Sequence, residues 1–332
     1  MEGFLMSRQR VSASQVAKLA NVSQSTVSRV FTPGASVSEK ARKRVMKVAN
    51  ELNYKPNALA RGLIMNKTNL VGIAMKTIQN PFYHETLAIF TKKLKEIGYS
   101  VLFVNSENEE IQQDEINQFL EYNVEAIIVT DAILSSGLVD KLSKAQIPVF
   151  LFNRRDETSN CYSVTCDNVN AAHSIAEYFY QKGHKHNVFL SGLSNTSTNK
   201  ERLKGFKSYF EQRNMEIDII QGNYTYEKAY YRTYEYLKSG KKIDALFGAN
   251  DITALGALDA IKAYGLTVPE DVEIIGFDNI KMASWPNNNL STWSQPIEEM
   301  VDGILNILIN PDQVEEREQY VKGKLLKRKT TM

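Results

Sequence analysis

The chain has few features of a membrane protein, a secreted protein or a metalloprotein. Its 332 residues contain no run of ~18 apolar residues, so no membrane-spanning helix is predicted. Residues 1–10 lack the apolar stretch of a secretory signal, and we expect a disordered, weakly basic arm. Only two cysteines occur, Cys161 and Cys166, without enough nearby ligands for a metal site. We expect both to be plain small residues, because a cytoplasmic protein rarely holds a structural disulfide.

Signatures of catalysis are also missing from the sequence. It contains no GxGxxG motif, no phosphate-binding loop, no metal-binding pair and no nucleophile–base arrangement. We therefore expect neither an enzyme nor a protein that needs a cofactor or a metal. An apolar content of 43% and a charged content of 23% are ordinary for a soluble protein of two or three domains.

Two short helices joined by a tight turn are predicted near the N-terminus. Apolar residues at helical spacing indicate a first helix over residues 14–20, with Ser12 as its cap. Asn21 tolerates the left-handed conformation that a turn requires. Ser23 then caps a second helix, on which Val27 and Val30 face inward.

The outer face of the second helix has the composition of a DNA-reading surface. Its residues are small, polar or basic: Ser23, Gln24, Ser25, Ser28 and Arg29. Small polar side chains at a helix N-terminus fit the DNA major groove and present donors and acceptors to base edges. Taken alone, this stretch is also compatible with an ordinary solvent-facing helix.

Charge is distributed unevenly between the two parts of the sequence. Residues 1–67 carry 12 Lys or Arg and 3 acidic residues, about +9, whereas the whole chain is +2 and the remainder is near −7. Ser38 is expected to cap a third helix that ends at about Leu52 and contains a basic run from Lys40 to Lys47. Such asymmetry indicates that the N-terminal segment binds a polyanion.

A short segment follows the third helix. Pro56 ends the preceding helix and Asn57 can cap a new one that reaches about Met65. A helix of this length is marginal alone in water, so we expect it to need a partner, such as its symmetry mate on DNA.

From Leu70 onward, short apolar runs alternate with helical patterns. The first runs lie at 71–75, 100–105, 126–130 and 148–152, with helices near 82–97, 109–122 and 137–145. A second set lies at 163–166, 187–191, 244–249 and 272–277, with helices near 168–182, 200–213, 226–238 and 251–264. This alternation predicts βαβ units and a doubly wound parallel-sheet core of two lobes with a cleft between them. We expect the chain to cross between lobes near 166–168, near 290–296 and within the last ten residues, with a helix at 296–309 back on the first lobe.

Aromatic and polar residues follow successive strands of this core. They are Phe82, Tyr83, Asn153, Arg154, Arg202, Tyr224, Asn250, Asp278 and Gln295. Ligands of open parallel sheets bind beyond the carboxyl ends of the strands, and rings together with Arg, Asn, Asp and Gln suit a sugar. Taken singly, Asn250 and Asp278 can also be helix caps and Phe82 can be a core residue.

Several motifs give the whole chain a strong resemblance to one family. VSQSTVSRV, VSEKARKRV, LNYKPNALARGL, GAND, IIGFDN and LKRKTT occur in this order. The chain thereby resembles the lac repressor/galactose repressor family of bacterial transcription regulators. The resemblance implies a helix-turn-helix DNA-binding domain and a periplasmic-binding-protein-type core.

The resemblance also implies roles for individual residues. Gln24 and Ser25 match positions that read bases, and Arg29 matches a residue that touches base or backbone. Leu63 matches a hinge leucine that wedges into the minor groove. The strand-end residues match a sugar pocket, with one departure: Asn153 stands where relatives have Asp, which leaves the hydroxyl pattern of the ligand open there.

The sequence therefore predicts an α/β protein with an additional small all-α domain. We expect the DNA-binding domain at 11–56, a hinge helix and linker at 57–67, and the core at 68–332. The first lobe would comprise about 68–166 and 296–325, and the second about 167–292.

The predicted function is a cytoplasmic repressor of carbohydrate-utilisation genes, without a membrane partner. A homodimer would bind a palindromic operator in double-stranded DNA under the control of a sugar or sugar phosphate. Because no heptad tail follows LKRKTT, we favour a dimer over a tetramer. Two alternatives remain: a regulator of the same fold controlled by a phosphoprotein partner, and a sugar-binding protein of transport type.

Overall fold

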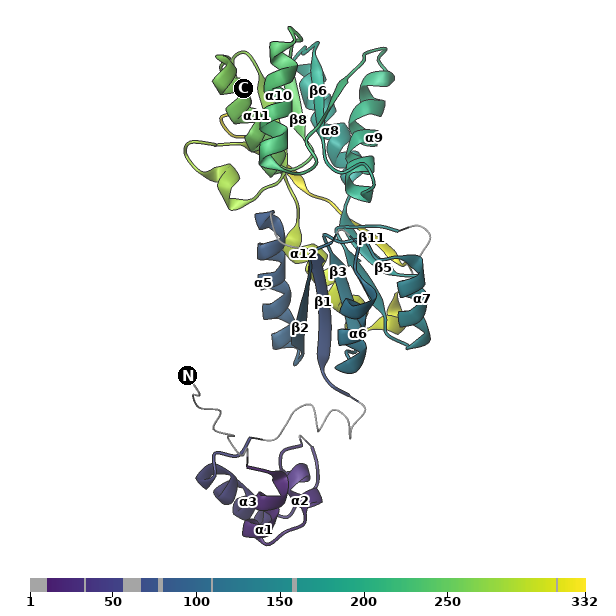
Figure 1. Ribbon diagram of the computed structural model, residues 1–332, viewed down its shortest axis with the longest axis vertical. Coiled ribbons are helices and arrows are strands. Elements are labelled where there is room, and N and C mark those ends of the chain that lie inside the picture. The colour runs from purple at the N-terminus through teal and green to yellow at the C-terminus, as the bar shows by residue number, and fades with distance from the viewer. Residues whose placement is uncertain are drawn as a thin grey trace, which may run out of the picture. The chain divides into compact units, whose positions relative to one another are not determined.

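The structure is a computed structural model. It describes residues 11–32, 34–55, 67–76, 80–108, 110–156, 160–314 and 316–332. The chain divides into two compact units, Met1–Asn69 and Leu70–Met332 (Figure 1). Each has its own hydrophobic core, so each can be understood as a separate folding problem.

The N-terminal unit is a bundle of three helices. They are α1 (Ala13–Ala20), α2 (Gln24–Val30) and α3 (Glu39–Glu51), each within one residue or so of the predicted position. Ser12, Ser23 and Ser38 cap them by accepting a hydrogen bond from the backbone three residues on, as predicted. Val16, Val27 and Val45 are fully buried where the three helices meet, so a few apolar side chains form the core of this unit.

The first lobe of the larger unit is built on a six-stranded parallel sheet of order β11-β5-β4-β3-β1-β2. Its strands are β1 (Leu70–Lys76), β2 (Ser100–Ser106), β3 (Ala126–Thr130), β4 (Val149–Phe152), β5 (Tyr162–Cys166) and β11 (Glu318–Val321). Its helices are α5 (Pro81–Glu96), α6 (Gln113–Glu121), α7 (Ser136–Lys144) and α12 (Ile297–Ile309). Helices α5 and α12 pack together on one core and α6 and α7 on another, so both faces of the sheet are covered.

The second lobe repeats this plan with the order β12-β10-β9-β8-β6-β7. Its strands are β6 (Asn187–Ser191), β7 (Asp218–Gln221), β8 (Ala245–Gly248), β9 (Glu273–Asp278), β10 (Ser291–Ser294) and β12 (Lys324–Leu326). Its helices are α8 (Asn168–Gln181), α9 (Ser197–Glu211), α10 (Tyr226–Lys238) and α11 (Asp251–Tyr264), with short 3-10 turns at Lys281–Ser284 and, in the first lobe, Pro311–Gln313. Helix α8 packs on α9, and α10 packs on α11. The strands are parallel except β12, which pairs antiparallel with β10.

The chain passes between the lobes three times. It leaves the first sheet after β5, returns after β10 to form α12, and crosses again between β11 and β12 (Figure 1). The lobe limits differ from the expected ones, because β10 extends the second lobe to Ser294 and β12 belongs to the second sheet rather than the first. The terminal residues stay there: the Thr330 hydroxyl donates to Ile274 and the Met332 backbone N–H donates to Glu273.

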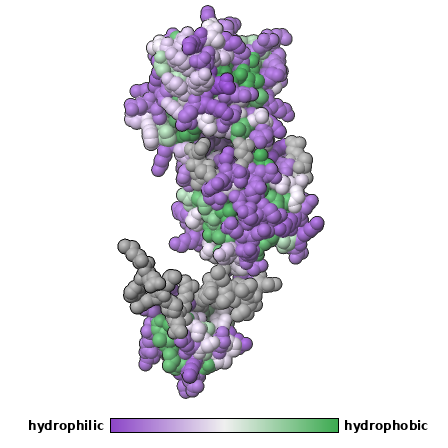
Figure 2. Space-filling model, viewed as in Figure 1, coloured by the Kyte–Doolittle hydropathy of each residue, from purple (hydrophilic) through white to green (hydrophobic). Residues whose placement is uncertain are grey.

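The predicted fold class is confirmed: two parallel-sheet α/β lobes accompany a small helical unit. Four strands, β7, β10, β11 and β12, were not predicted. None of the helices in the described ranges is long and apolar enough to cross a membrane. Hydrophilic side chains cover most of the visible face of the lobes (Figure 2).

Close helix packing in the second lobe gives the first testable prediction. A Cβ at Gly205 in α9 would lie 2.2 Å from the carbonyl oxygen of Val169 at the start of α8, and backbone cannot yield as a flexible side chain can. Gly205→Ala should lower the free energy of unfolding by about 1–3 kcal/mol in urea titrations. The matched control is Gly137→Ala in α7, where a Cβ would meet nothing within 4 Å. Equal stabilities of the two variants would contradict the packing.

Candidate functional site

Helix α2 presents a polar face to its surroundings. Gln24, Ser25 and Arg29 are exposed and Ser28 is half-buried, while Val27 and Val30 are buried beneath them. Ser23 is committed to the cap, where its hydroxyl accepts from the Thr26 backbone N–H at 3.2 Å. The side-chain oxygen of Gln24 accepts a hydrogen bond from Ser14 of α1 at 3.2 Å, which steadies an otherwise free amide.

Helix α3 supplies the positive charge of the same unit. Lys40, Lys43, Arg44 and Lys47 are exposed, whereas Arg42 turns back and donates to the carbonyl of Val30 at 3.0 Å, joining α3 to α2. A polar helix beside exposed cations combines base contacts with phosphate contacts. Asn57 and Leu63, predicted to act at the hinge, lie outside the described residues.

The larger unit contains a pocket of about 250 Å³ between its two lobes. The first lobe contributes Lys76, Asn80, Tyr83, Asp131, Asn153 and Arg154, and the second contributes Leu193, Thr198, Arg202, Asn223, Tyr224, Thr225, Lys228, Asn250 and Asp278. Seven of the nine residues predicted from strand ends are in this lining. The carboxyl ends of the strands in both sheets therefore meet at this pocket. Ligands of open parallel sheets bind at this end of the strands.

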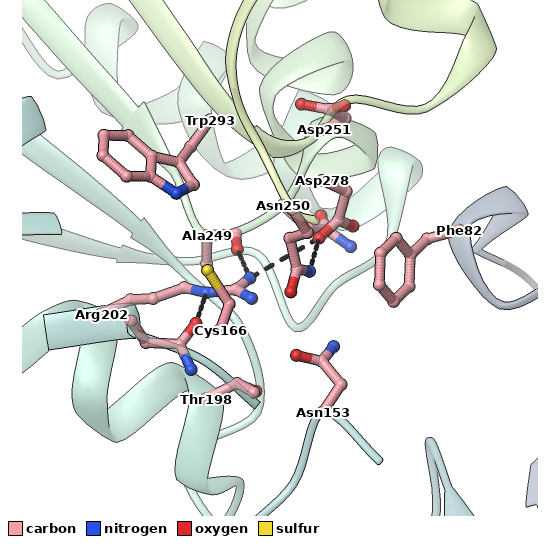
Figure 3. Close-up of polar contacts among 12 residues, drawn as sticks. Phe82, Asn153, Cys166, Thr198, Arg202, Ala249, Asn250, Asp251, Asp278 and Trp293 are labelled. Carbon is pink, nitrogen blue, oxygen red and sulfur yellow. Dashed lines mark hydrogen bonds and ion pairs between the residues drawn. The ribbon is translucent and has the colours of Figure 1, made fainter. Parts of the chain in front are cut away.

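Arg202 is the most thoroughly enclosed charge of the pocket, with 2% of its surface exposed. Its Nη1 donates to the carbonyl of Ala249 (Figure 3). Its Nε donates to Asn168 at 2.9 Å, and its guanidinium lies 3.5 Å from the centre of the Phe277 ring. Its Nη2 is buried and has no hydrogen-bond partner within the described part of the chain. A buried donor left unpaired is costly, so a hydrogen-bond acceptor placed at this N–H group would stabilise it.

Asp278 lies opposite Arg202, at 4.0 Å from its Nη1 (Figure 3). One carboxylate oxygen accepts from the Nε2 of Gln295 at 2.7 Å and the other from the Nδ2 of Asn80 at 2.9 Å. Asn80 stands at the N-cap of α5, so this last hydrogen bond joins the two lobes. Burial raises the pKa of Asp278 to about 6, although Arg202 and the two amides lower it.

A second buried Arg–Asp pair stands in the first lobe. The Nη2 of Arg154 lies 3.2 Å from Asp131, while its Nε and Nη1 are buried without partners among the described residues. Burial raises the pKa of Asp131, and Arg154 and Lys76 oppose that rise. Each lobe thus places one partly unsatisfied arginine in the lining.

Backbone strain gathers around the pocket. Asp131, Asn153, Asn223, Tyr224 and Asp278 all have positive φ, between 52° and 120°. This region is unfavourable for a side chain as large as tyrosine. At Tyr224 the ring fits because Gly192 lies beneath it, where a Cβ would come within 2.0 Å of the ring. Strained backbone of this kind persists where the surrounding structure holds functional groups in place.

Two of the predicted pocket residues lie elsewhere. Phe82 is 1% exposed, packs edge-on against Tyr83 and is not in the lining of this pocket, so its contact with an effector stays a prediction. Gln295 lies behind the pocket, where its amide supports Asp278. Asn250 does line the pocket and also caps α11, accepting from the Thr253 backbone N–H at 2.9 Å.

Other lining residues were missed in the sequence. Asp131 directly follows β3, so the strand-end rule could have found it. Lys76 is the last residue of β1, and Thr198 and Lys228 are on helices, where no local signal marks them. Asp251, expected to act mainly as a cap, is buried and accepts from the Ile280 backbone N–H at 2.8 Å and from the Thr292 hydroxyl, which fixes the strand ends behind the pocket.

The described residues contain no cluster of three His, Cys, Asp or Glu that could hold a metal ion. Both cysteines are buried, and Cys166 is a free thiol. Burial raises the pKa of Cys166 to about 11, which keeps its thiol protonated at neutral pH.

The raised pKa of Asp278 predicts a pH dependence of stability. A carboxyl whose pKa is higher in the folded state loses stabilisation as pH rises from its ordinary value of 3.8 towards 6. Between pH 5 and pH 7 the free energy of unfolding should therefore fall by about 1.4 kcal/mol more in the parent than in Asp278→Asn. Urea titrations at the two pH values measure this difference. The control Asp259→Asn, in α11, should lose as much stability between the two pH values as the parent does. An equal loss in Asp278→Asn and the parent would refute the raised pKa of Asp278.

Both units match known protein families. Residues 14–57 match the family described as bacterial regulatory proteins of the lacI family, and residues 71–284 match the periplasmic binding protein domain. Catabolite control protein A of Priestia megaterium is 32% identical over 290 residues, which cover 86% of this chain and 87% of that protein. The transcriptional regulator AscG of Escherichia coli K12 is 31% identical and covers 89% and 90%.

Solved structures agree with these sequence matches. The crystal structure of the lac repressor dimer bound to operator and the anti-inducer ONPF has a TM-score of 0.87 and 25% identity, covering 98% of this chain and 100% of that one. Because the similarity spans both units in the same order, it concerns the whole architecture rather than one domain. The chain belongs to the lacI family of bacterial regulatory proteins and is a DNA-binding transcriptional regulator.

Proposed function

We propose that this regulator binds a near-palindromic operator as a homodimer and is controlled by a sugar or sugar phosphate in the pocket between its lobes. Each protomer would place α2 in the major groove of one half-site, with Gln24, Ser25 and Arg29 toward base edges. Ser28 would lie at the margin of this contact, and Ser23 would fix the start of the helix. Since operator DNA is the partner, the regulator would act in the cytoplasm.

The observation that carries the effector proposal is the pair of buried, partly unsatisfied arginines. Arg154 and Arg202 come from different lobes, and each has buried N–H groups without partners among the described residues. Sugar hydroxyls can accept from these groups while donating to Asp131 or Asp278. Tyr83 and Tyr224, also from different lobes, offer ring faces for the apolar side of a sugar.

Control of DNA binding would follow from a change in the angle between the two lobes. A ligand held by both lobes stabilises the conformation in which both sets of contacts are made. The hydrogen bond that Asn80 donates to Asp278 joins the two lobes at one edge of the pocket. A change in lobe angle would reach the dimer interface and the segment before β1, and thereby change operator affinity.

The DNA-reading proposal is tested with Gln24→Ala. Losing a base-edge contact should reduce discrimination between the operator and half-site variants by about 1–3 kcal/mol. The comparison variant Arg44→Ala should weaken binding to every sequence alike and reduce its salt dependence. Anisotropy titrations at two salt concentrations separate these effects. Unchanged sequence preference in Gln24→Ala would remove that residue from base reading.

The effector proposal is tested with Asp278→Asn. A thermal-shift screen of sugars and sugar phosphates first identifies a compound that stabilises the protein. Operator titrations with and without this compound should then show a response in the parent and in Asp259→Asn. The response should be lost in Asp278→Asn, with operator affinity in the absence of compound unchanged. A full response in that variant would place the effector site elsewhere.

A further inference from the structure

A second pocket, of about 240 Å³, is also lined by Asp278, at the end of β9. Helix α5 contributes Glu85 and Ile89 to this lining, and the stretch from the end of β10 into α12 contributes residues 294–299. Within the described part of the chain, Asp278 is the only residue that this lining shares with the proposed effector pocket. The second pocket therefore has walls from both lobes, and we call it the acidic pocket.

The charged side chains in the lining of the acidic pocket are all carboxylates among the described residues: Glu85, Asp278, Glu298 and Glu299. Asp278 is buried beside Arg202, but the three glutamates are exposed and form no ion pair within the described ranges. The Nζ of Lys93 lies 3.5 Å from the carbonyl oxygen of Glu298, but it is paired with Asp302 at 2.6 Å. Carboxylates gathered in one pocket repel each other, and a cation that binds among them relieves this repulsion.

Helix geometry explains only part of this group of carboxylates. Glu298 and Glu299 stand in the first turn of α12, where the helix dipole stabilises carboxylates without any ligand. Glu85 belongs to a different helix, α5, and lies beyond its first turn. The dipole of α12 therefore does not account for the negative charge that α5 adds to the pocket.

The side chain of Gln295 is an independent sign of a missing ligand. It is 4% exposed, and its Nε2 donates to Asp278 at 2.7 Å. Reversing the amide would turn its oxygen toward the carboxylate of Asp278, so the oxygen has to face the other way. This oxygen, Oε1, is buried and has no hydrogen-bond partner in the part of the chain that the structure describes. Because Gln295 lines the acidic pocket and not the effector pocket, a ligand in the acidic pocket can supply the donor.

A metal ion fits this lining poorly. No group of three His, Cys, Asp or Glu among the described residues is arranged to hold one, so the carboxylates do not converge on a single point. Ile89, Pro296 and Ile297 add apolar surface to the same lining. A cation with two separated charges and an apolar chain between them matches separated carboxylates beside apolar side chains.

We infer that the acidic pocket binds an aliphatic diammonium cation, that is, a diamine or a polyamine. One ammonium group donates to Oε1 of Gln295, and another pairs with the exposed glutamates of α5 and α12. A cation at Oε1 also strengthens the hydrogen bond from Nε2 to Asp278, because linked hydrogen bonds polarise one another. The inference goes beyond the proposed effector control and does not rest on it.

The test measures binding to the full chain in the absence of DNA and sugar. Diaminobutane, diaminopentane and spermidine are compared at equal ionic strength with butylamine, which has one ammonium group, and with magnesium chloride. At saturating concentration, at least one of the first three compounds should raise the melting temperature by roughly 3 °C or more. Butylamine and magnesium should have a smaller effect. The inference is overturned if either of them stabilises the protein as much, or if none of the diamines and polyamines stabilises it.

Variants of the lining show whether binding occurs in the acidic pocket. Glu85→Gln and Glu298→Gln should each weaken binding of the stabilising amine about three- to fivefold in calorimetric titrations, because exposed ion pairs are individually weak. Gln295→Met should weaken it about tenfold or more, because this variant removes a buried acceptor from a charged donor.

The matched control is Glu96→Gln, which removes an exposed carboxylate from the same helix as Glu85, outside the lining. It should bind the amine as the parent does. A general attraction of polyamines to the acidic unit would be weakened equally by Glu85→Gln and Glu96→Gln. Equal affinities of these two variants would therefore overturn the inference, and the operator response to a sugar would be unaffected by that result.

Discussion

The buried charge of Arg202 is the constraint on which the second lobe depends. One guanidinium is held by Asn168 at the start of α8, by the carbonyl of Ala249 after β8, and by the Phe277 ring of β9. Removing such a group from water is costly unless its donors are matched, and three separate strand and helix ends supply the partners. The positive charge of Arg202 also lowers the pKa of Asp278, which burial raises. The packing of the strand and helix ends and the electrostatics of the pocket thus both depend on the Arg202 side chain.

Polar contacts join the two lobes beside the pocket. Asn80 donates to Asp278 at one edge. Elsewhere the backbone N–H of Arg155 donates to Ser197 at 3.0 Å, and its Nε lies 3.3 Å from Glu201. Partly exposed hydrogen bonds and ion pairs contribute little net energy each, since water competes for both partners. Such a junction can change its geometry at small cost, which a ligand-controlled pair of lobes requires.

Much of this architecture follows from local sequence signals. The helices near the N-terminus were predicted closely, because a serine cap and apolar spacing are properties of a few neighbouring residues. The long buried strands were also predicted, because a continuous apolar run is likewise a property of neighbouring residues. By contrast, β7 and β12 have only four and three residues and are mostly exposed or half-buried, so they lack the continuous apolar run that marks a central strand.

Predicting the pocket depended on where each strand ends. This rule identified Arg154 and Asp278, which line the pocket, and Phe82, whose ring is buried at the start of α5 and is not in the lining. It could not identify Lys228, because a lysine on a helix has no distinctive local pattern. Only the fold brings Lys228 into the same lining as Lys76, which stands 152 positions earlier in the sequence.

Strand β1 connects these features to the DNA-binding unit. It begins at Leu70, the first residue of the larger unit, and ends at Lys76 in the pocket lining. Its seven residues span roughly 20 Å at about 3.3 Å per residue, and it is paired on both sides, with β2 and β3. A strand held from both sides moves with its sheet. Any ligand that repositions the first lobe through Lys76 or Arg154 must therefore also displace the point at which the DNA-binding unit is attached.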